Sequence, residues 1–337
     1  MAGNITNYGD ISPRTAAFAA KEFLERAIPY LVIEKFGQGK PLPSNSSKTM
    51  VFRRYNAISA TPNVLVEGVT PTGKTLTTTD VPVTLEQLGD RVVITDVIMD
   101  THEDPVFREA QEVLGEQAGQ MIEIARFGVL KAGANVYRAN GVVRTDINTP
   151  ITLGLQRKIT RYLKRQMAKK TTTVIKSTAN YGTQAVAPAY IALCHSDCEA
   201  DIRNMPGFVP VENYGAGMTP YESELGKVED VRYIYSTIFD CWADGGGAYA
   251  GSGTAMLSTS TVNADIYPIL FLGKNAYGIV PLKGANAIVP MVVNPKPSDS
   301  DPMAQRGHVA WKTMTKAVIL NDAWMVRAEV AVTANPS

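Results

Sequence analysis

The stretch PVFREAQEVLGEQAGQMIEIARFGVLKAG, residues 105–133, decides the fold of this chain. Asp104 before it is a good helix N-cap, and Pro105 suits the first helical position. A helix over these residues would be about 43 Å long at 1.5 Å per residue, which is well above the usual length in a globular domain. Its glycines weaken it locally, so we expect other elements to pack along it. Its apolar residues recur three or four positions apart, the spacing of one helix face, at Val106, Ala110, Val113, Leu114, Ala118, Met121, Ile122, Ala125, Val129 and Leu130.

Upstream of this helix the sequence predicts extended structure. Residues 14–36 favour a short helical arm broken near Pro29, and the Gly/Pro/Ser-rich residues 37–48 read as a linker. A turn at residues 70–73 would join two of the following segments into a long β-hairpin. Segments rich in β-branched and aromatic residues predict strands at 49–59, 63–67, 76–83 and 91–98.

The segment GVTPTGKT, residues 68–75, matches the phosphate-binding loop of P-loop nucleotide hydrolases at every fixed position. A true P-loop needs a helix to begin at the Lys-Thr pair, because the phosphates rest on the free N–H groups of that helix. The following residues, LTTTDVPVT at 76–84, are mostly β-branched and include Pro82, so no helix is expected there. Pro71 also removes one backbone donor from the loop. The context therefore favours a hairpin turn over a nucleotide site.

Downstream of the long helix, a second helix is predicted to start at Thr149-Pro150. One of its faces is apolar, and the other is the most basic surface of the chain, with no acidic residue among its cations. A solvated helix face would explain this pattern, and so would a surface for phosphate groups or an acidic partner. The cations of this face are Arg157, Lys158, Arg161, Lys164, Arg165, Lys169 and Lys170.

Short strands dominate the rest of the chain. A small helix is expected at about 197–205. Residues 308–320 and 324–332 read as strands on either side of an Asn321-Asp322 turn, which predicts a terminal hairpin. Further strands are predicted at 171–177, 189–195, 228–239 and 265–273.

Composition narrows the functional classes. Lys and Arg number 33 against 32 Asp and Glu, a net charge of +1, so nothing in the overall charge indicates a nucleic-acid binder, and any such role must be local. The N-terminus has no basic region followed by an apolar run, so no secretory signal is expected. The most apolar region, residues 266–293, is interrupted by prolines and lysines and is not expected to span a membrane.

No convincing catalytic or metal site emerges from the reactive side chains. Cys194, His195 and Cys198 cluster in sequence, but a structural zinc site needs a fourth ligand, and Cys241 lacks the paired spacing of zinc modules. Buried core thiols are the favoured interpretation. The other histidines are His102 and His308, so a Ser or Cys triad has few candidate bases. We expect no catalytic residue, no metal and no cofactor.

The order of these parts, together with the segments themselves, resembles the major capsid proteins of tailed bacteriophages, and most closely the subgroup typified by the coliphage N-four type. No single segment is diagnostic, but the series covers nearly the whole chain in the order of the family. The segments are VFRRYNAI (51–58), LVEGVTP (65–71), TLEQLGDRVVITD (84–96), LGEQAGQMIEIARFGVLKAG (114–133), YIALCHSDCEADIR (190–203), ELGKVEDVRYIYS (224–236) and RGHVAWKTMTKAVILNDAWMVRAEV (306–330).

The resemblance implies the α+β fold of tailed-phage capsid proteins, in which the long helix is a spine and an extended loop reaches over a neighbouring subunit. The implied parts are an N-terminal arm (1–45), an extended β-hairpin loop (46–100), a peripheral domain with the spine helix 105–133 (101–185), an axial domain that meets others at capsomer centres (186–300) and closing strands of the peripheral domain (301–337).

The implied function is structural and non-catalytic. Copies of the chain would assemble as pentamers and hexamers into the icosahedral head shell that encloses the double-stranded DNA genome. Portal, scaffolding and decoration proteins, and packaged DNA through non-specific contacts, are further implied partners, and no membrane is involved. The implied location is the virion, after assembly in the host bacterial cytoplasm. An encapsulin-like nanocompartment shell and a P-loop nucleotide-binding enzyme remain as alternatives.

Two surfaces are candidate contact sites under this interpretation. The basic helix, through Arg157, Lys158, Arg161, Lys164 and Arg165, would face packaged DNA or an acidic neighbour. Lys74 is also placed where some capsid relatives cross-link a loop Lys to an Asn of a neighbour. The extended loop would contact other subunits through Arg53, Arg54, Glu67, Gly68, Gly73 and Lys74.

Overall fold

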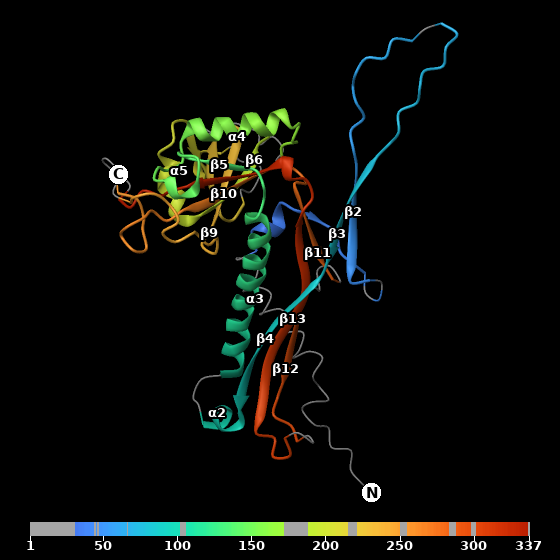
Figure 1. The fold of residues 1–337 in the computed structure, drawn as a ribbon. Helices are drawn as coiled ribbons and strands as arrows, with labels where there is room; N and C mark the ends of the chain where they lie inside the picture. Colours follow the sequence, from blue (N-terminus) through green and yellow to red (C-terminus); the bar gives the residue numbers. More distant parts are fainter. Residues whose placement is uncertain are drawn as a thin grey trace.

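One long helix connects two β-sheets, and a β-hairpin projects away from both sheets (Figure 1). The structure, a computed structural model, describes residues 31–335 apart from residues 44, 46, 66, 102–105, 172–187, 215–220, 250–254, 283–287 and 298–300. Among the described residues, no helix combines the length and the apolar character needed to cross a membrane.

The long helix is α3, Val106–Lys131, and it confirms the helix predicted from the apolar spacing. Its 26 residues give a rod of about 39 Å. The predicted cap at Asp104 and Pro105 lies outside the described residues. Gly115 and Gly119, which weaken an isolated helix, are both buried in the packed structure.

The N-terminal two thirds of α3 pack against a five-stranded sheet. Strand β13 is the central strand of this sheet. β4 pairs with one edge of β13, and β12 and β11 pair with successive parts of the other edge. Leu114 and Ile122 of the helix form a buried cluster with Trp311 of β13. The strands are β1 (Gln38–Gly39), β4 (Glu86–Thr95), β11 (Tyr277–Pro281), β12 (Ile288–Val293) and β13 (Arg306–Ile319).

The C-terminal end of α3 packs against the second, seven-stranded sheet. Phe127 stacks on Phe239 with ring centroids 4.5 Å apart, and Leu130 lies in the same cluster. The strands, in sheet order, are β5 (Val136–Arg138), β14 (Met325–Val330), β10 (Tyr267–Leu272), β6 (Tyr190–His195), β9 (Val231–Ser236), β8 (Glu224–Val228) and β7 (Phe208–Pro210).

Both faces of the seven-stranded sheet are covered, which explains why its strands β6 and β10 are almost continuously apolar. In β6, Ile191 and Leu193 pack toward the α3 side. The alternate residues of β6 pack on the other face with Leu155 and Ile159 of α4. The covering helices on that side are α4 (Leu153–Arg165) and the short α5 (Glu199–Arg203).

The remaining elements are short or peripheral. The projecting hairpin consists of β2 (Thr49–Tyr55) and β3 (Thr78–Thr84). A one-and-a-half-turn helix, α2 (Asp96–Thr101), follows β4 directly, so the strand predicted at 91–98 ends at residue 95. The 3-10 turns are η3 (Ile33–Lys35), η4 (Arg144–Asp146), η5 (Ser196–Cys198), η6 (Val211–Asn213) and η8 (Asp322–Trp324).

The predicted terminal hairpin is wrong. β13 and β14 do not pair, because β13 belongs to the five-stranded sheet and β14 to the seven-stranded sheet. The N–H groups of Leu320 and Asn321 both donate to the carbonyl of Ala276, and the η8 turn then redirects the chain. The Asn321-Asp322 turn is therefore a crossing point between sheets.

Four other local predictions differ from the structure or fall outside it. The second helix starts at Leu153, capped by the Thr152 hydroxyl, which accepts the Leu155 N–H at 3.2 Å. Thr149, where the helix was expected to start, instead accepts a backbone hydrogen bond from Ala331. The strand predicted at 63–67 does not form at its described residues. Most of the helical arm at 14–36, and nearly all of the strand at 171–177, lie outside the described residues.

A fully buried carboxyl group holds the residues before the first sheet against α3. Glu123 accepts the N–H groups of Val32 and Ile33 through Oε1, at 3.0 and 2.8 Å. Tyr277 donates its hydroxyl to the carbonyl of Ile33, and Arg126 of α3 pairs with Glu34. Burial raises the pKa of Glu123 to about 7, against the opposing effect of the two N–H groups and Arg126.

We expect Glu123→Gln to remove a pH-dependent part of the stability. The folded state holds the Glu123 proton more tightly than the unfolded chain, so the contribution of the neutral carboxyl is complete below pH 4.5 and is lost as pH rises to about 7. The loss is roughly 3 kcal/mol over that window, at 1.36 kcal/mol per pH unit. Urea unfolding of unassembled subunits across this range should show the wild type losing stability relative to the variant. Glu109→Gln, at an exposed position of the same helix, is the control, and parallel curves for wild type and Glu123→Gln would refute the expectation.

A buried charge pair lies in the seven-stranded sheet. Arg232 of β9 is 4% exposed, and its Nε donates to Oε1 of Glu224 at 2.6 Å. The same carboxylate accepts the Tyr214 hydroxyl at 2.9 Å, and the rings of Tyr214 and Tyr221 flank the guanidinium. The hydrogen bonds and rings replace the water that both charges lose.

Glu224→Gln should destabilise the subunit by about 3 kcal/mol, because it leaves the Arg232 charge buried without its counter-ion. Glu222→Gln removes the partner of a solvent-exposed pair with Lys35 two residues away and should cost less than about 1 kcal/mol. Denaturant midpoints of the two variants measure the difference. Equal denaturant midpoints for the two variants would show that the buried pair stabilises the subunit no more than the exposed pair does.

Candidate functional site

The β2–β3 hairpin is anchored at its base and extends from the molecule beyond it. The strands pair from Thr49 with Thr84 to Tyr55 with Thr78. Near the base, Phe52 packs in a buried cluster with Val280 of the five-stranded sheet. Arg53 and Asp80 join the strands by two hydrogen bonds of 2.8 Å, which raise the pKa of Arg53 and lower that of Asp80. The predicted site residue Arg54 is exposed on the same strand.

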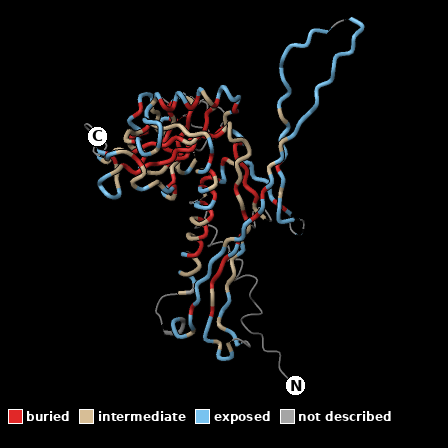
Figure 2. Tube along the Cα trace, viewed as in Figure 1, coloured by how far each residue is buried: buried red, intermediate tan, exposed pale blue. Residues whose placement is uncertain are grey.

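Beyond this ladder, residues 56–77 form a long loop whose described residues are almost all exposed (Figure 2). Such a loop is normally polar, but this one carries large apolar side chains. No described part of the chain covers them. They are Ile58, Val64, Leu65, Val69 and Leu76, between 50% and 87% exposed.

The P-loop-like segment forms the returning half of this loop. The described turn lies at Glu67-Gly68, where Gly68 has a φ of +78°, so the turn predicted at 70–73 is not the tip. Gly73 is exposed in an extended stretch, and Lys74 donates its Nζ to the carbonyl of Ser59 at 2.6 Å. Strand β3 follows at Thr78 instead of a helix, so the segment lacks the helix N-terminus on which a P-loop depends.

The basic face of α4 is partly neutralised by residues distant in sequence. Arg157 donates to Glu229 at 2.9 Å, and Lys164 pairs with Asp230. Lys170 also donates to Asp230, at 2.9 Å. These hydrogen bonds raise the pKa of Arg157 and Lys164. The sequence indicated a face without acids, but the β8–β9 turn supplies two.

Three cations of α4 itself make no ion pair or side-chain hydrogen bond with the part of the chain that the structure describes, and neither does Lys169 beyond the end of the helix. Lys158, Arg161 and Arg165 are exposed and follow one another along the helix. They line a small pocket of about 120 Å³ together with Tyr137 and Tyr162, whose rings are 5.9 Å apart.

The Cys/His cluster is part of the core. Cys194 and Cys198 are buried among apolar side chains, and burial raises the pKa of both thiols. His195 uses Nδ1 to accept the Asp197 N–H at 3.2 Å. Cys241 is half-buried. Within the described ranges, no group of three or more His, Cys, Asp or Glu residues could hold a metal ion.

Two clusters escaped the sequence analysis because their members are far apart in the chain. Trp242 lies under the cations of Lys131, at 4.1 Å, and Arg144, at 3.7 Å. Arg144 and Arg327 also pair with the fully buried Glu329. These contacts tie the end of α3 to β14 and resemble no catalytic arrangement.

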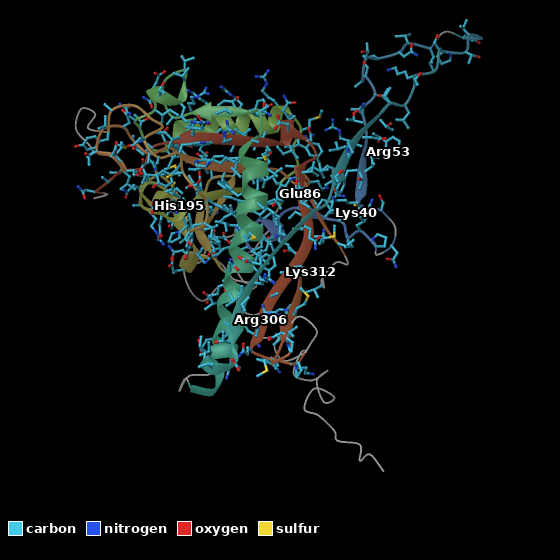
Figure 3. The ribbon with its side chains drawn as sticks, turned by 60° about the horizontal axis from the view of Figure 1, so that its bottom comes forward. Lys40, Arg53, Glu86, His195, Arg306 and Lys312 are labelled. Carbon is cyan, nitrogen blue, oxygen red and sulfur yellow. The ribbon has the colours of Figure 1, made fainter. Side chains whose placement is uncertain are left out.

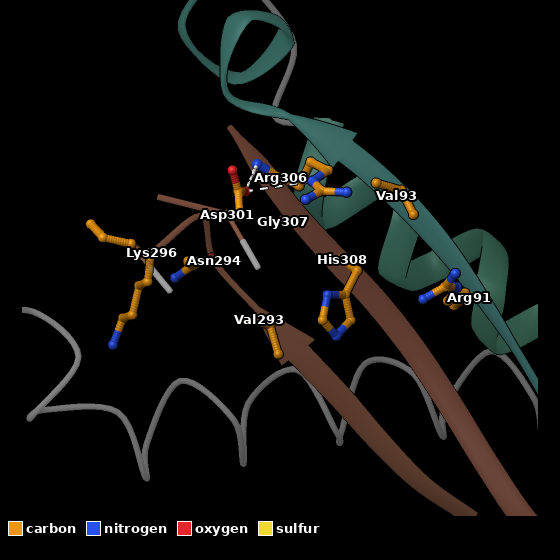
Figure 4. A pocket seen from close by; sticks show the side chains of 10 residues that line it. Arg91, Val93, Val293, Asn294, Lys296, Asp301, Arg306, Gly307 and His308 are labelled. Carbon is orange, nitrogen blue, oxygen red and sulfur yellow. Dashed lines mark hydrogen bonds and ion pairs between the residues drawn. The ribbon is translucent and has the colours of Figure 1, made fainter. Parts of the chain in front are cut away.

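The second missed cluster lines a pocket of about 390 Å³ on the face of β4, β12 and β13 that points away from α3 (Figure 4). Arg91, Lys296 and His308 are among its lining residues, and Arg306 pairs there with Asp301 at 3.6 Å. Figure 3 shows that Arg306 and Lys312 lie along this sheet, apart from Arg53 on the hairpin and from His195. The charged side chains labelled in Figure 3 therefore lie on several separate surfaces.

Comparisons with known proteins agree with a shell-forming chain. The family model described as phage capsid protein matches residues 78–295, more than half of the sequence. No curated protein matches the sequence. The fold is similar to the capsid of Ralstonia phage GP4, with a TM-score of 0.59 and 13% identity over 89% of this chain and 88% of that one. The cyanophage Pam1 capsid gives a TM-score of 0.58 and 14% identity over 89% of each chain.

An encapsulin complex from Synechococcus elongatus also has a similar fold, with a TM-score of 0.53 and 11% identity over 100% of this chain and 94% of that one. Identities this low show the fold alone, and the family match carries the assignment. Both agree with the α+β fold and the family that the sequence resemblance implied. The chain therefore belongs to the phage capsid protein family, and it is a structural major capsid protein with the tailed-phage capsid fold.

Proposed function

We propose that copies of this chain assemble as pentamers and hexamers into a closed icosahedral shell around double-stranded DNA, and that the loop 56–77 lies on a neighbouring copy. The observation that carries the proposal is the exposed apolar loop on a well-anchored hairpin. Isolated hairpins are marginal in water, and the described part of the subunit offers this loop nothing to pack on. Burying each of its large apolar side chains on a neighbour would contribute on the order of 1.5–3 kcal/mol.

The two sheets divide the subunit into two parts, for which we propose different positions in the shell. We assign the five-stranded sheet and most of α3 to a peripheral part, and the seven-stranded sheet with α4 to an axial part near capsomer centres. This assignment places residues 153–165 and 325–330 in the axial part, whereas the sequence-based boundaries put them in the peripheral domain.

The proposal also covers the setting of the shell. Assembly would occur in the host bacterial cytoplasm, with portal and scaffolding proteins and decoration proteins as further partners and no catalytic step. A nanocompartment shell is the second candidate, favoured by the encapsulin-like fold. Electron microscopy and nucleic-acid content of particles from infected cells separate the two: DNA-filled heads with a portal support the first, and genome-free shells around a protein cargo support the second.

Val64→Asp with Leu65→Asp should abolish shell assembly and leave the subunit folded. Both side chains are highly exposed in the loop, so charges there cost the isolated subunit little but would be buried in an interface. The matched control is Val142→Asp with Val143→Asp, which changes two exposed valines on a different surface.

Electron microscopy and sedimentation of both variants measure the result, with circular dichroism to check folding. Folded subunits of the loop variant that form no particles, beside normal particles of the control, are the expected outcome. Normal particles from the loop variant would overturn the proposed contact.

A further inference from the structure

We propose that Lys158, Arg161 and Arg165 of α4, a set we call the open stripe, contact the sugar–phosphate backbone of the packaged double-stranded DNA. The inference rests on the proposed function and specifies which residues of the chain meet the genome. It divides the basic face of α4 into two halves with different roles.

The cations of one half of the basic face pair with acidic residues of the same subunit. Arg157 and Lys164 pair with Glu229 and Asp230, and Lys170 shares Asp230. These contacts hold the β8–β9 turn against the helix. Their charges are compensated within the subunit, so they offer little attraction to an external anion.

The other half is uncompensated. The three cations of the open stripe have no acidic partner among the described residues, and they occupy positions i, i+3 and i+7 of the helix. The outer two are about 10.5 Å apart along the helix axis, a span that covers several phosphates of a duplex. Arginine guanidinium groups suit phosphate oxygens because they can donate two parallel hydrogen bonds.

The helix presents this stripe rigidly. The side chain of Gln156, fully buried, donates to the carbonyl of Val228 at 2.8 Å and accepts the Tyr233 hydroxyl at 2.8 Å. Tyr162, next to Arg161, donates its hydroxyl to Asn135 at 3.1 Å. A fixed helix means that binding orders only the ends of three long side chains.

The chemistry of the surface favours a nucleic acid over an acidic protein. From Arg157 to Arg165, every exposed residue is a cation, and the apolar residues of α4 face the sheet. Protein interfaces normally centre on buried aromatic or aliphatic anchors, whereas the two tyrosines beside this stripe, Tyr137 and Tyr162, are already half-buried within the subunit. Binding through charge alone is typical of non-specific contact with a phosphate backbone.

The test is binding of unassembled subunits to a 30-base-pair duplex of mixed sequence, followed by fluorescence anisotropy between 50 and 300 mM NaCl. The test variant is Lys158→Gln with Arg161→Gln and Arg165→Gln. The control is Lys40→Gln with Lys48→Gln and Lys312→Gln, three exposed lysines on other surfaces, so both variants lose the same charge.

We expect the test variant to bind at least about tenfold more weakly at 100 mM NaCl, and its slope of log K against log salt to fall by up to about 2.7, or 0.9 per lost phosphate contact. The control should change much less. Equal losses in both variants would show that net charge alone matters, and an unchanged slope in the test variant would show no stripe contact. Either result overturns the proposal.

Two further measurements separate this proposal from its alternatives. Binding of a poly-glutamate peptide that depends on the open stripe, without DNA binding, would assign the surface to an acidic protein and reject the genome contact. Electron microscopy of the test variant should still show closed shells. Failure of both wild type and variant to form shells would instead reject the proposed function, whatever the DNA result.

Discussion

The burial of α3 against two different sheets is the constraint on which the rest of this subunit depends. A helix of 26 residues is too long to be covered by one small sheet. Its two ends are therefore buried against different sheets. Leu114 and Ile122 pack on the five-stranded sheet, while Phe127 and Leu130 pack on the seven-stranded sheet. Because one rigid helix belongs to both cores, the two sheets keep a fixed relation to each other.

Other contacts between residues distant in sequence strengthen the packing of α3 against the rest of the chain. Glu123 fixes the residues before the first sheet onto the helix, and Arg327 donates to the carbonyl of Lys131 at the C-terminal end, where helix carbonyls lack partners. β13 and β14 follow one another in sequence but join different sheets, so the chain closes both cores within its last thirty or so residues. The subunit therefore has two hydrophobic cores that are joined by one helix.

The surfaces that this unit leaves open match the needs of a shell protein. The hairpin loop carries apolar side chains that no described part of the subunit covers. Several charges elsewhere are paired within the subunit, as Arg157 with Glu229 and Arg53 with Asp80 illustrate. A near-neutral chain with paired surface charges lets like subunits approach without strong repulsion, which many modest contacts in a shell require. The open stripe differs from the other exposed cations because its three uncompensated side chains follow one another along one helix.

The sequence by itself determined the elements whose signal is local. The 3.6-residue spacing of apolar positions predicted α3 nearly to the residue, and β-branched runs located β2, β6, β9 and β10. The sequence also indicated that no helix follows the P-loop-like segment, because Pro82 and the surrounding β-branched residues disfavour a helix. Family membership followed from the order of many segments, none of them diagnostic alone.

Only the tertiary structure decided which elements are neighbours. The pairing of Glu229 and Asp230 with α4, the assignment of β13 and β14 to different sheets, and the burial of Glu123 under Val32 all join residues distant in the chain. Periodicity describes which face of an element is apolar, but it carries no information about which other element covers that face. That choice is made by the packing of the whole chain, where side chains from separate segments compete for the same buried volume.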